Sequence, residues 1–355
     1  MKKLKIAIIG LGEISEHHIQ GYLNNKNTEI YAFCDMNAEL LIKKGEKYGI
    51  SRLYTDLATM FKELPEIDAV SVCTCNCAHA SCSMMALNAG KDVLCEKPMA
   101  MNATEAKAML ETAKKNNKKL MVGFVRRFGN DTAVVKDFIQ NGSLGDIYYA
   151  KATYLRRNGN PGGWFGDKKR SGGGPLIDLG VHIIDLTRYL MGNPKPISVY
   201  GVTFNKLGNR KGLKDDLISY VSEKKTDNDI CDVEDFAVAF IRYDNGAVLS
   251  VETSFSLNIK SNVGVIELFG TNGGVKLAPE FELFTQINGY LADVKLNMDT
   301  RLSFNGLFQK EIDYFVDALL TDKDLTEIAE DGVILMEIID AIYKSAENGR
   351  EILLY

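Results

Sequence analysis

The chain has 355 residues, of which 46% are hydrophobic and 25% are charged. These fractions are typical of globular proteins and exclude a disordered, collagenous or coiled-coil chain. With 42 Lys and Arg against 47 Asp and Glu, the net charge is −5, which argues against a nucleic-acid or anionic-membrane binder. Because one core rarely grows beyond about 250–300 residues, we expect two domains.

The N-terminus reads MKKLKIAIIGLGE, with two lysines before a short apolar stretch. This stretch ends in glycines and Glu13 instead of the small-residue cleavage site of a signal peptide. No apolar run in the sequence is long enough to span a bilayer. We therefore expect a cytoplasmic protein that binds neither nucleic acid nor membrane.

Five of the seven cysteines lie between residues 73 and 95, which is not the spacing of a disulfide framework. Cys73, Cys75 and Cys77, with His79 nearby, could be interpreted as a zinc site. However, Cys73 ends a predicted buried strand, and neither pair has the usual Cys-x2-Cys spacing. We favour small buried thiols and predict no metal.

Strands and helices alternate in the first part of the chain. The predicted strands are 4–9, 29–34, 68–73, 92–95 and 119–124, and the predicted helices are 13–24, 37–48, 78–89 and 102–116. This alternation predicts a doubly wound parallel sheet with helices on both faces, over residues 1–124. Such sheets bind ligands beyond the carboxyl ends of their strands.

The second part, residues 125–355, has a different pattern. A helix (131–141), a strand (146–156) and a strong helix (175–191) precede a stretch that is mostly β (197–300), and helices at about 306–320 and 328–347 follow. The pattern predicts an α/β domain with an antiparallel or mixed sheet and helices on one face. The alternative for the two terminal helices is packing on the first domain.

A glycine turn, Gly10-Leu11-Gly12-Glu13-Ile14-Ser15, joins the first predicted strand to the first predicted helix. Such a turn lets the backbone approach a pyrophosphate at the positive end of a helix. Ser15 replaces the third glycine of the usual fingerprint and is small enough for close packing of helix against strand. We expect the cofactor to contact Gly10, Gly12, Glu13 and Ile14.

Asp35 follows the second predicted strand, at the distance of about 20 residues expected of a ribose-binding acid. A carboxylate there accepts hydrogen bonds from the ribose hydroxyls of adenosine and repels a 2′-phosphate. No Arg follows at Met36 or Asn37 to bind such a phosphate. NAD is therefore favoured over NADP, with an ordinary turn or helix N-cap as the alternative role of Asp35.

Glu96-Lys97-Pro98 follows the strand 92–95, at the ligand-binding edge of the predicted sheet. A lysine at this place can bond a substrate hydroxyl near the nicotinamide. Pro98 sets the local turn and is a candidate for a cis peptide bond. Position alone leaves an ordinary surface loop as the alternative.

Asp178 and His182 lie four residues apart on the helix that follows Gly172-Gly173-Gly174, so they share one face. A polar face on an otherwise apolar helix indicates the lining of a cleft. Histidine is suited to proton transfer at neutral pH, and a nearby carboxylate can orient it. A structural histidine and a carboxylate–histidine metal pair are the alternatives.

Together these segments resemble the glucose–fructose oxidoreductase and inositol dehydrogenase family, Gfo/Idh/MocA, nearly end to end. The matching segments are Gly10/Gly12, Asp35, Asn76-x-x-His79, Ala89-Gly90-Lys91, Glu96-Lys97-Pro98, Arg126-Arg127-Phe128, Gly172-Gly173-Gly174 with Asp178-x3-His182, and Val233-Glu234-Asp235. The pairing of Glu96-Lys97-Pro98 with the Asp178–His182 helix is the most specific part. Cys75 departs from the family, which often has Pro before Asn76, and so does Ser15.

The resemblance implies a Rossmann domain, then an α/β domain with a large, open, mostly antiparallel sheet that joins homodimers or homotetramers. It implies hydride transfer between NAD(P) and a secondary alcohol of a sugar or cyclitol. Lys97 would polarise the hydroxyl, His182 would be the general acid/base and Asp178 would assist it. Thr74, Asn76, His79, Glu96 and Lys97 would lie along the cofactor, and Arg126 would contact the substrate.

The loop 158–165 holds Trp164, the only tryptophan of the chain. An indole can pack on the flat C–H face of a sugar, and Arg156 can donate hydrogen bonds to sugar oxygens. We expect Trp164 and Arg156 to line the substrate pocket, against the alternative of a core tryptophan and a surface arginine.

The predicted function is NAD-dependent oxidation of a ring hydroxyl of a sugar, cyclitol or glycoside, including oxidation at C3. One alternative enzyme keeps NAD bound and recycles it, for sugar transhydrogenation or redox-assisted glycoside cleavage. The non-enzyme alternative is an NAD-sensing regulatory protein that kept the fold and lost catalysis.

Overall fold

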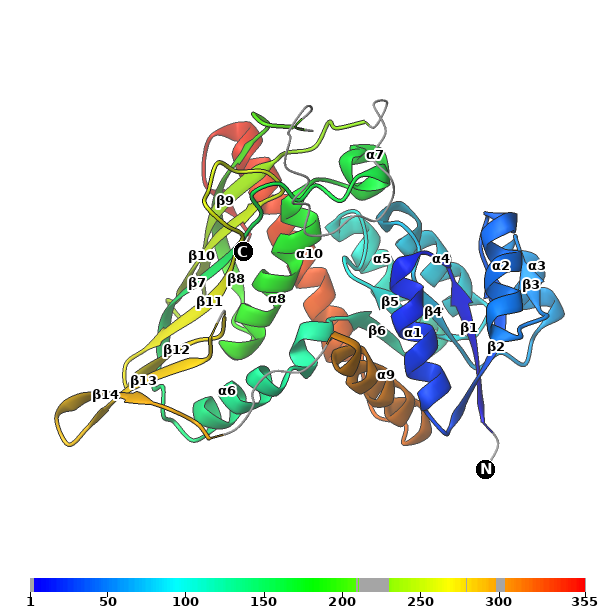
Figure 1. The fold of residues 1–355 in the computed structure, drawn as a ribbon, viewed down its shortest axis with the longest axis horizontal. Coiled ribbons are helices and arrows are strands. Elements are labelled where there is room, and N and C mark those ends of the chain that lie inside the picture. Colours follow the sequence, from blue (N-terminus) through cyan, green and yellow to red (C-terminus); the bar gives the residue numbers. More distant parts are fainter. Residues whose placement is uncertain (1–2, 209, 211–229, 279, 298–303, 355) are drawn as a thin grey trace. The chain divides into compact units, whose positions relative to one another are not determined.

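Figure 1 shows the fold in a computed structural model, which describes residues 3–208, 210, 230–278, 280–297 and 304–354. Parts of the predicted β-rich stretch 197–300, including 211–229, therefore lie outside the described residues. The chain forms two compact units, Met1–Phe128 with Ser303–Met336, and Gly129–Leu302 with Glu337–Tyr355. Helix α9 (Phe304–Leu320) belongs to the first unit, and α10 (Thr326–Asn348) contributes to both.

The first unit contains a six-stranded sheet in the order β3-β2-β1-β4-β5-β6, with parallel neighbours throughout. Its strands are β1 (Leu4–Ile9), β2 (Thr28–Cys34), β3 (Leu53–Tyr54), β4 (Ala69–Val72), β5 (Asp92–Glu96) and β6 (Leu120–Gly123). Its other helices are α1 (Glu13–Asn24), α2 (Ala38–Tyr48), α3 (Leu57–Glu63), α4 (Asn76–Asn88) and α5 (Ala103–Asn116). The predicted parallel α/β sheet is confirmed. The strand order reverses between β1 and β4, which is where such sheets bind ligands.

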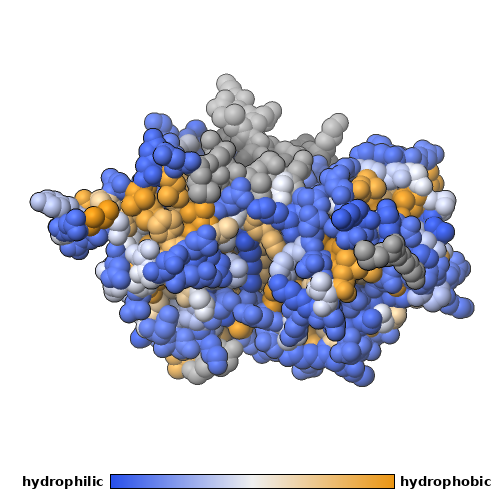
Figure 2. Space-filling view, turned by 90° about the horizontal axis from the view of Figure 1, so that it is seen from below, coloured by the Kyte–Doolittle hydropathy of each residue, from blue (hydrophilic) through white to orange (hydrophobic). Residues whose placement is uncertain are grey.

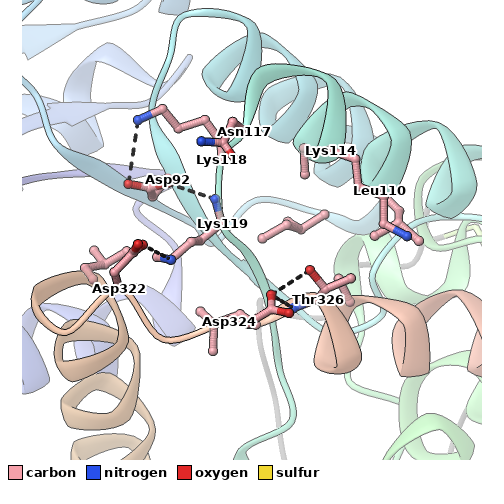
Figure 3. Close-up of a pocket in the computed structure, with 14 residues that line it drawn as sticks. Asp92, Leu110, Lys114, Asn117, Lys118, Lys119, Asp322, Asp324 and Thr326 are labelled. Atoms are coloured by element: carbon pink, nitrogen blue, oxygen red, sulfur yellow. Dashed lines mark hydrogen bonds and ion pairs between the residues drawn. The ribbon is translucent and has the colours of Figure 1, made fainter.

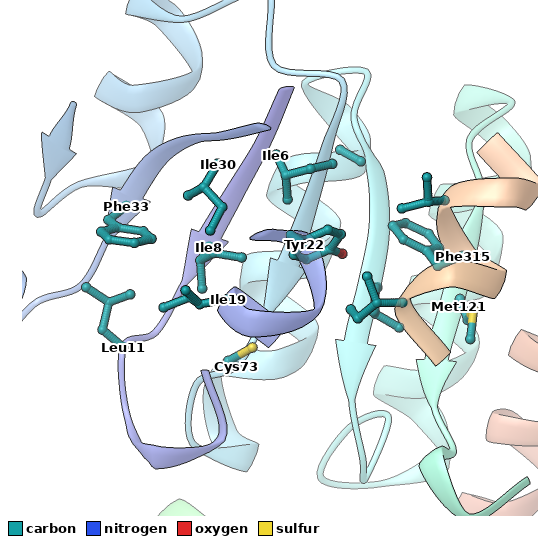
Figure 4. Close-up of a cluster of buried hydrophobic side chains, with 14 of the residues drawn as sticks. Ile6, Ile8, Leu11, Ile19, Tyr22, Ile30, Phe33, Cys73, Met121 and Phe315 are labelled. Carbon is teal, nitrogen blue, oxygen red and sulfur yellow. The ribbon is translucent and has the colours of Figure 1, made fainter. Parts of the chain in front are cut away.

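The core of this unit explains how α9 joins it. Ile6 and Ile8 of β1 and Tyr22 of α1 are fully buried, and Phe315 of α9 packs in the same cluster (Figure 4). A Cβ atom on Gly21 of α1 would lie 2.8 Å from the Ile312 side chain, so a glycine is needed where α1 and α9 meet. The last part of the chain therefore helps to build the first unit.

The second unit contains a nine-stranded sheet in the order β14-β13-β12-β11-β7-β10-β9-β8-β15. Its strands are β7 (Ile147–Leu155), β8 (Pro196–Phe204), β9 (Phe236–Tyr243), β10 (Val248–Ser254), β11 (Val263–Gly270), β12 (Gly273–Lys276), β13 (Glu282–Ile287), β14 (Tyr290–Val294) and β15 (Ile352–Leu353). Only the β7–β10 pair among these neighbours is parallel, so the predicted mostly antiparallel sheet is confirmed.

One face of this sheet is covered by α8 (Val181–Leu190), against which α6 (Asn130–Gln140) packs. The other face carries aromatic side chains at its surface, including Tyr200 and Phe240, which lie opposite each other on β8 and β9. Hydrophobic side chains also reach the surface of the β13–β14 hairpin, where Leu291 is 93% exposed (left side of Figure 2). None of the helices in the described ranges has both the length and the hydrophobicity of a membrane span.

Candidate active site

The glycine turn lies between β1 and α1, as predicted. Gly10 has a φ of +83°, and a Cβ atom there would lie 2.8 Å from the backbone of Cys73. Only glycine fits this conformation and this close approach. The Ser15 hydroxyl donates a 2.6 Å hydrogen bond to the carbonyl of Gly12, so the serine packs in place of a third glycine.

The N-terminus of α1 is suited to an anion. Gly12 is its N-cap residue and provides no side-chain cap, and a Cβ atom on Gly12 would meet no other atom within 4 Å. The helix therefore presents its first amides and its positive dipole end to open space. These residues fit the pyrophosphate of a dinucleotide cofactor.

The carboxylate of Asp35 holds the glycine turn. Its Oδ2 accepts a 2.7 Å hydrogen bond from the backbone amide of Leu11, and its Oδ1 accepts one of 2.7 Å from the amide of Asn37. Asp35 is half-buried at the carboxyl end of β2, beside the turn. The neighbouring Asn37, not Asp35, caps α2 through its side chain.

The loop after β4 brings Thr74, Asn76 and His79 to the same edge of the sheet. His79 is buried, and its Nδ1 lies 2.7 Å from the carbonyl oxygen of Pro98, while its Nε2 lies 3.1 Å from that of Thr74. Burial lowers the pKa of His79 although both contacts favour the charged ring. His79 thus joins the loop after β4 to the turn after β5.

The cysteines of this loop differ from the expected buried thiols. Cys73 is buried, but Cys75 is half-buried and Cys77 is exposed. The reason is that Cys75 and Cys77 lie beyond the end of β4, at the N-cap and in the first turn of α4. Their sulfur atoms are 3.3 Å apart.

The Glu96-Lys97-Pro98 turn begins at the last residue of β5. The Lys97–Pro98 peptide bond is cis, which confirms the expectation. Lys97 is half-buried at the carboxyl edge, whereas Glu96 is only 5% exposed and its carboxylate faces inward. Glu96 Oε2 accepts a 3.1 Å hydrogen bond from the backbone amide of Lys97.

A pocket of about 420 Å³ in the first unit lies at the opposite edge of the sheet (Figure 3). It is lined by Asp92 at the start of β5 and by Lys119 just before β6. Lys119 forms a 2.7 Å ion pair with Asp322. This pocket is at the amino ends of the strands, so it is separate from the predicted cofactor edge.

In the second unit, the triple glycine packs against two groups that the sequence did not single out as site residues. A Cβ atom on Gly174 would lie 2.2 Å from the carbonyl oxygen of Glu234, and one on Gly173 would lie 2.0 Å from the hydroxyl of Tyr343. The Glu234 carboxylate accepts the Tyr343 hydroxyl at 2.9 Å. The family match did include Glu234, but only the fold brings it to the glycines.

The sequence predicted one continuous α-helix over 175–191 for the segment that carries Asp178 and His182, and this prediction was wrong in part. Residues Leu176–Gly180 form a π-turn, and α8 follows. Gly180 permits this local packing, because a Cβ atom there would lie 3.1 Å from Leu176 and 3.4 Å from Thr253. π-Turns are frequent at functional sites.

Asp178 and His182 are half-buried, whereas all other residues from 173 to 188 are buried. Asp185, one turn further along, is only 5% exposed. The helix therefore presents Asp178 and His182 on its one accessible face, and this partial exposure suits proton exchange with a small ligand.

The remaining predicted substrate residues lie outside this helix. Trp164 is half-buried and stacks on Phe165 with ring centroids 4.0 Å apart. Arg156 is 8% exposed, and its guanidinium donates a 2.9 Å hydrogen bond to the carbonyl of Gly159 within its own loop. Arg126 is exposed in the first unit, in the short helix Val125–Phe128.

Comparison with known proteins extends this description. Residues 4–124 match the NAD-binding Rossmann fold of an oxidoreductase family, and residues 136–354 match the C-terminal α/β domain of the same family. The protein belongs to the Gfo/Idh/MocA oxidoreductase family. The resemblance inferred from its motifs is therefore confirmed.

Relatives in the Gfo/Idh/MocA family include D-glucoside 3-dehydrogenase of Escherichia coli, which is 34% identical over 98% of this chain and 97% of its own length. Levoglucosan dehydrogenase of Pseudarthrobacter phenanthrenivorans is 29% identical over 78% of this chain and 73% of its own length.

Solved structures agree with this family fold. Levoglucosan dehydrogenase in complex with NADH superimposes with a TM-score of 0.86, with 24% identity and full coverage of both chains. Aldose-aldose oxidoreductase from Caulobacter crescentus, complexed with glycerol, has a TM-score of 0.81 and 25% identity, covering 99% of this chain and 100% of its own.

Proposed function

We propose that this oxidoreductase is an NAD-dependent dehydrogenase that oxidises a ring secondary hydroxyl of a sugar, cyclitol or glycoside. The observation that carries the proposal is the accessible Asp178–His182 face on an otherwise buried helix. The Lys97 turn at the carboxyl edge of the Rossmann sheet adds the second reactive group.

Each residue has one role in the proposed reaction. Lys97 donates a hydrogen bond from its ammonium group to the reacting hydroxyl and so polarises it. His182 accepts the hydroxyl proton on its neutral imidazole, and Asp178 orients the ring. When bound, NAD would supply the hydride acceptor for the carbinol carbon, which is the chemistry that the side chains cannot supply.

The proposed cofactor is NAD rather than NADP. The Asp35 carboxylate lies beside the glycine turn, where an adenosine ribose would reach it. A 2′-phosphate at that place would meet a negative charge. Gly10, Gly12, Glu13 and Ile14 would hold the pyrophosphate, and Thr74, Asn76, His79 and Glu96 would line or support the cofactor edge.

The proposed substrate class is a glycoside or sugar that is oxidised at C3. Its support is the 34% identity to D-glucoside 3-dehydrogenase over nearly the whole chain. Levoglucosan and myo-inositol dehydrogenases are also among the relatives. Trp164 would pack on the sugar face, and Arg126 and Arg156 would shape the substrate side.

A second candidate is a redox-recycling enzyme that keeps NAD bound and transfers hydride between two sugars. The likeness to an aldose-aldose oxidoreductase, at 25% identity and a TM-score of 0.81, favours this candidate over an NAD-sensing protein without catalysis. Both candidate enzymes use the same residues. They differ in whether free NADH leaves the protein.

The test is NADH formation, followed by absorbance, with NAD and a panel of methyl glucosides, levoglucosan, D-glucose and myo-inositol. The proposal expects free NADH with at least one glucoside, and a 3-keto product by NMR. Turnover of two mixed sugars without net NADH would establish the recycling enzyme instead. Cofactor binding without turnover of any panel member would contradict both.

We also propose that the protein forms homodimers or homotetramers through the sheet of the second unit. The support is the exposed aromatic pair of Tyr200 and Phe240 on its uncovered face. Light scattering during gel filtration should give a dimer or tetramer mass. The Phe240→Lys variant should reduce that mass, and an unchanged mass would contradict this interface.

A further inference from the structure

A buried polar chain runs beneath the Lys97 turn in the first unit. The hydroxyl of Tyr22 lies 2.8 Å from Ser71 Oγ, and Ser71 Oγ lies 3.2 Å from His18 Nδ1. His18 Nε2 lies 2.8 Å from Glu96 Oε1. Tyr22, Ser71 and His18 are 0% exposed, so water does not compete for these bonds.

One arrangement of protons satisfies every bond of this chain. Glu96, as a carboxylate, only accepts, so His18 Nε2 carries a proton and donates it. If Tyr22 donates to Ser71, then Ser71 donates to His18 Nδ1. In the reverse direction the Ser71 hydroxyl would donate to the Tyr22 oxygen. The Tyr22 proton would then have no acceptor among the described groups around it. The chain therefore ends on a carboxylate that also accepts the amide of Lys97.

Glu311 of α9 is the remaining member of this cluster. It is 0% exposed, and neither of its carboxyl oxygens has a hydrogen-bond partner among the described residues. Glu311, Glu96 and His18 each offer an atom within 4.8 Å of the others. Phe308, one turn earlier on α9, lies against the His18 ring with centroids 5.7 Å apart and keeps this part of the helix in place.

Two carboxylates this close in a buried place repel each other strongly, so only one of them is charged. The Glu96 carboxylate accepts hydrogen bonds from His18 and from the Lys97 amide, whereas no donor or positive charge among the described residues is bonded to Glu311. We propose that Glu311 is an uncharged carboxylic acid, so that it does not repel the Glu96 carboxylate, and that Glu96, bonded to His18, is the positioning residue for Lys97.

The electrostatic environment supports this division of charge. Burial and the neighbouring Glu96 raise the pKa of Glu311 well above its ordinary value. Burial acts in the same direction on Glu96, but the hydrogen bond from His18 and the charge of Lys97 oppose it, and the pKa of Glu96 is lowered.

A metal ion is the competing interpretation of the same cluster. It would need the lone pair of His18 Nε2, which is the atom whose proton is directed at Glu96. It would also need Glu96 oxygens that already accept His18 and the Lys97 amide. The hydrogen-bond directions therefore favour a proton over a metal.

The charge of Glu311 is tested by infrared difference spectroscopy of wild type against Glu311→Gln at neutral pH. The proposal expects the wild type to show the C=O stretch of a protonated carboxylic acid that the variant lacks. Loss of carboxylate bands alone would overturn it. Elemental analysis of both proteins, purified without chelator, accompanies this test, and a metal that is bound by the wild type and lost in Glu311→Gln would overturn it as well.

The positioning role is tested with Glu96→Gln, whose amide cannot accept both His18 and the Lys97 backbone. Hydrogen exchange at the Lys97 amide should become on the order of tenfold faster, as expected for loss of a charged hydrogen bond. The matched control is Ser83→Ala, at a buried serine that is not part of the hydrogen-bonded chain from Tyr22 to Glu96. It should leave exchange at the Lys97 amide unchanged. Unchanged exchange in Glu96→Gln would overturn the positioning role.

A third test measures turnover and rests on the proposed dehydrogenase function. With the panel sugar that gives the fastest NADH formation, Glu96→Gln should lower kcat on the order of 10²-fold, the effect of misplacing a reacting group by about 1 Å. Glu311→Gln should retain more turnover than Glu311→Leu. Wild-type kcat in Glu96→Gln would overturn the positioning role. If no sugar reacts, the proposed function fails, whereas infrared spectra and hydrogen exchange still decide this inference.

Discussion

The backbone amide of Gly174 donates a hydrogen bond of 2.9 Å to the carboxylate of Glu234. The same carboxylate accepts the amide of Leu176 at 3.1 Å and the hydroxyl of Tyr343 at 2.9 Å. Burial raises the pKa of Glu234, and these three bonds oppose that effect. Glu234 thus acts as the N-terminal cap of the helix that carries Asp178 and His182.

Glu234→Ala should therefore lower both thermal stability and turnover. It leaves two amides without their acceptor, at a cost of about 1–3 kcal/mol. It should also loosen the helix start and so reduce kcat. Differential scanning fluorimetry and the sugar assay measure these effects, with the exposed Glu347→Ala on α10 as a control. If Glu234→Ala keeps the Tm and turnover of the wild type, the prediction is wrong, and water has replaced the carboxylate as the acceptor of the two amides.

Asp35→Asn should narrow the preference for NAD over NADP. The amide oxygen can still accept the Leu11 amide, so the glycine turn is retained, while the negative charge and the exposed bond from the Asn37 amide are lost. We expect tighter NADP binding and little change in protein stability, measured by titration calorimetry with both dinucleotides. Asp56→Asn, at the exposed N-cap of α3, is the matched control. A wild-type preference for NADP would contradict the proposed role of Asp35.

Lys97→Ala should lower turnover much more than NAD affinity, because the ammonium group is proposed to act on the substrate hydroxyl. Steady-state kinetics with the best panel sugar and an NAD titration separate the two effects. Lys114→Ala, which removes a surface ion pair with Glu330, controls for loss of a lysine. Near-wild-type oxidation by Lys97→Ala would leave Lys97 as an ordinary loop residue.

His182→Ala should reduce the rate on the order of 10²–10⁴-fold, as is typical of a positioned acid/base. The NAD Kd should be largely unchanged. In the wild type, the rate of alcohol oxidation should rise with pH through one ionisation, because only the neutral imidazole accepts the proton. Chelation should leave wild-type activity intact. Loss of activity on chelation that a divalent metal restores would assign Asp178 and His182 to a metal site instead.

Glu311 should make the protein less stable as pH rises. Its pKa is raised in the folded state, so above the ordinary glutamate pKa the folded chain keeps a proton that the unfolded chain releases. The contribution of Glu311 to the free energy of unfolding is fully present below the pKa of the unfolded state. It is lost as pH rises through the pKa of the folded state, and between the two values it falls by about 1.4 kcal/mol per pH unit. Glu311→Gln removes this dependence.

Thermal unfolding of wild type and Glu311→Gln at a series of pH values above about 5 checks this prediction. The Tm of Glu311→Gln minus the Tm of the wild type should increase with each step up in pH. Glu29→Gln, at an exposed position on β2, should show no such trend. Parallel Tm curves for wild type and Glu311→Gln would contradict a raised pKa for Glu311.

Local patterns predicted the strands of the first sheet except β3, but in the second sheet they gave bounds for β7 alone and described the rest only as a mostly β stretch. β1 has the predicted bounds, and α2 begins one residue after the predicted start because Asn37 caps it. The two-residue β3 and the short α3 were missed, since neither is long enough to show a period. The π-turn before α8 was also missed.

Local sequence patterns were sufficient for the parallel sheet, the glycine turn, the Lys97 turn and the Asp178–His182 helix. Each depends on residues that are close along the chain, where spacing and side-chain chemistry are enough to identify them. Folding of distant segments onto one another was needed to bring Glu311 beside Glu96, and Glu234 to the amides of Gly174 and Leu176. The charge states of these partners depend on burial, which no local pattern encodes.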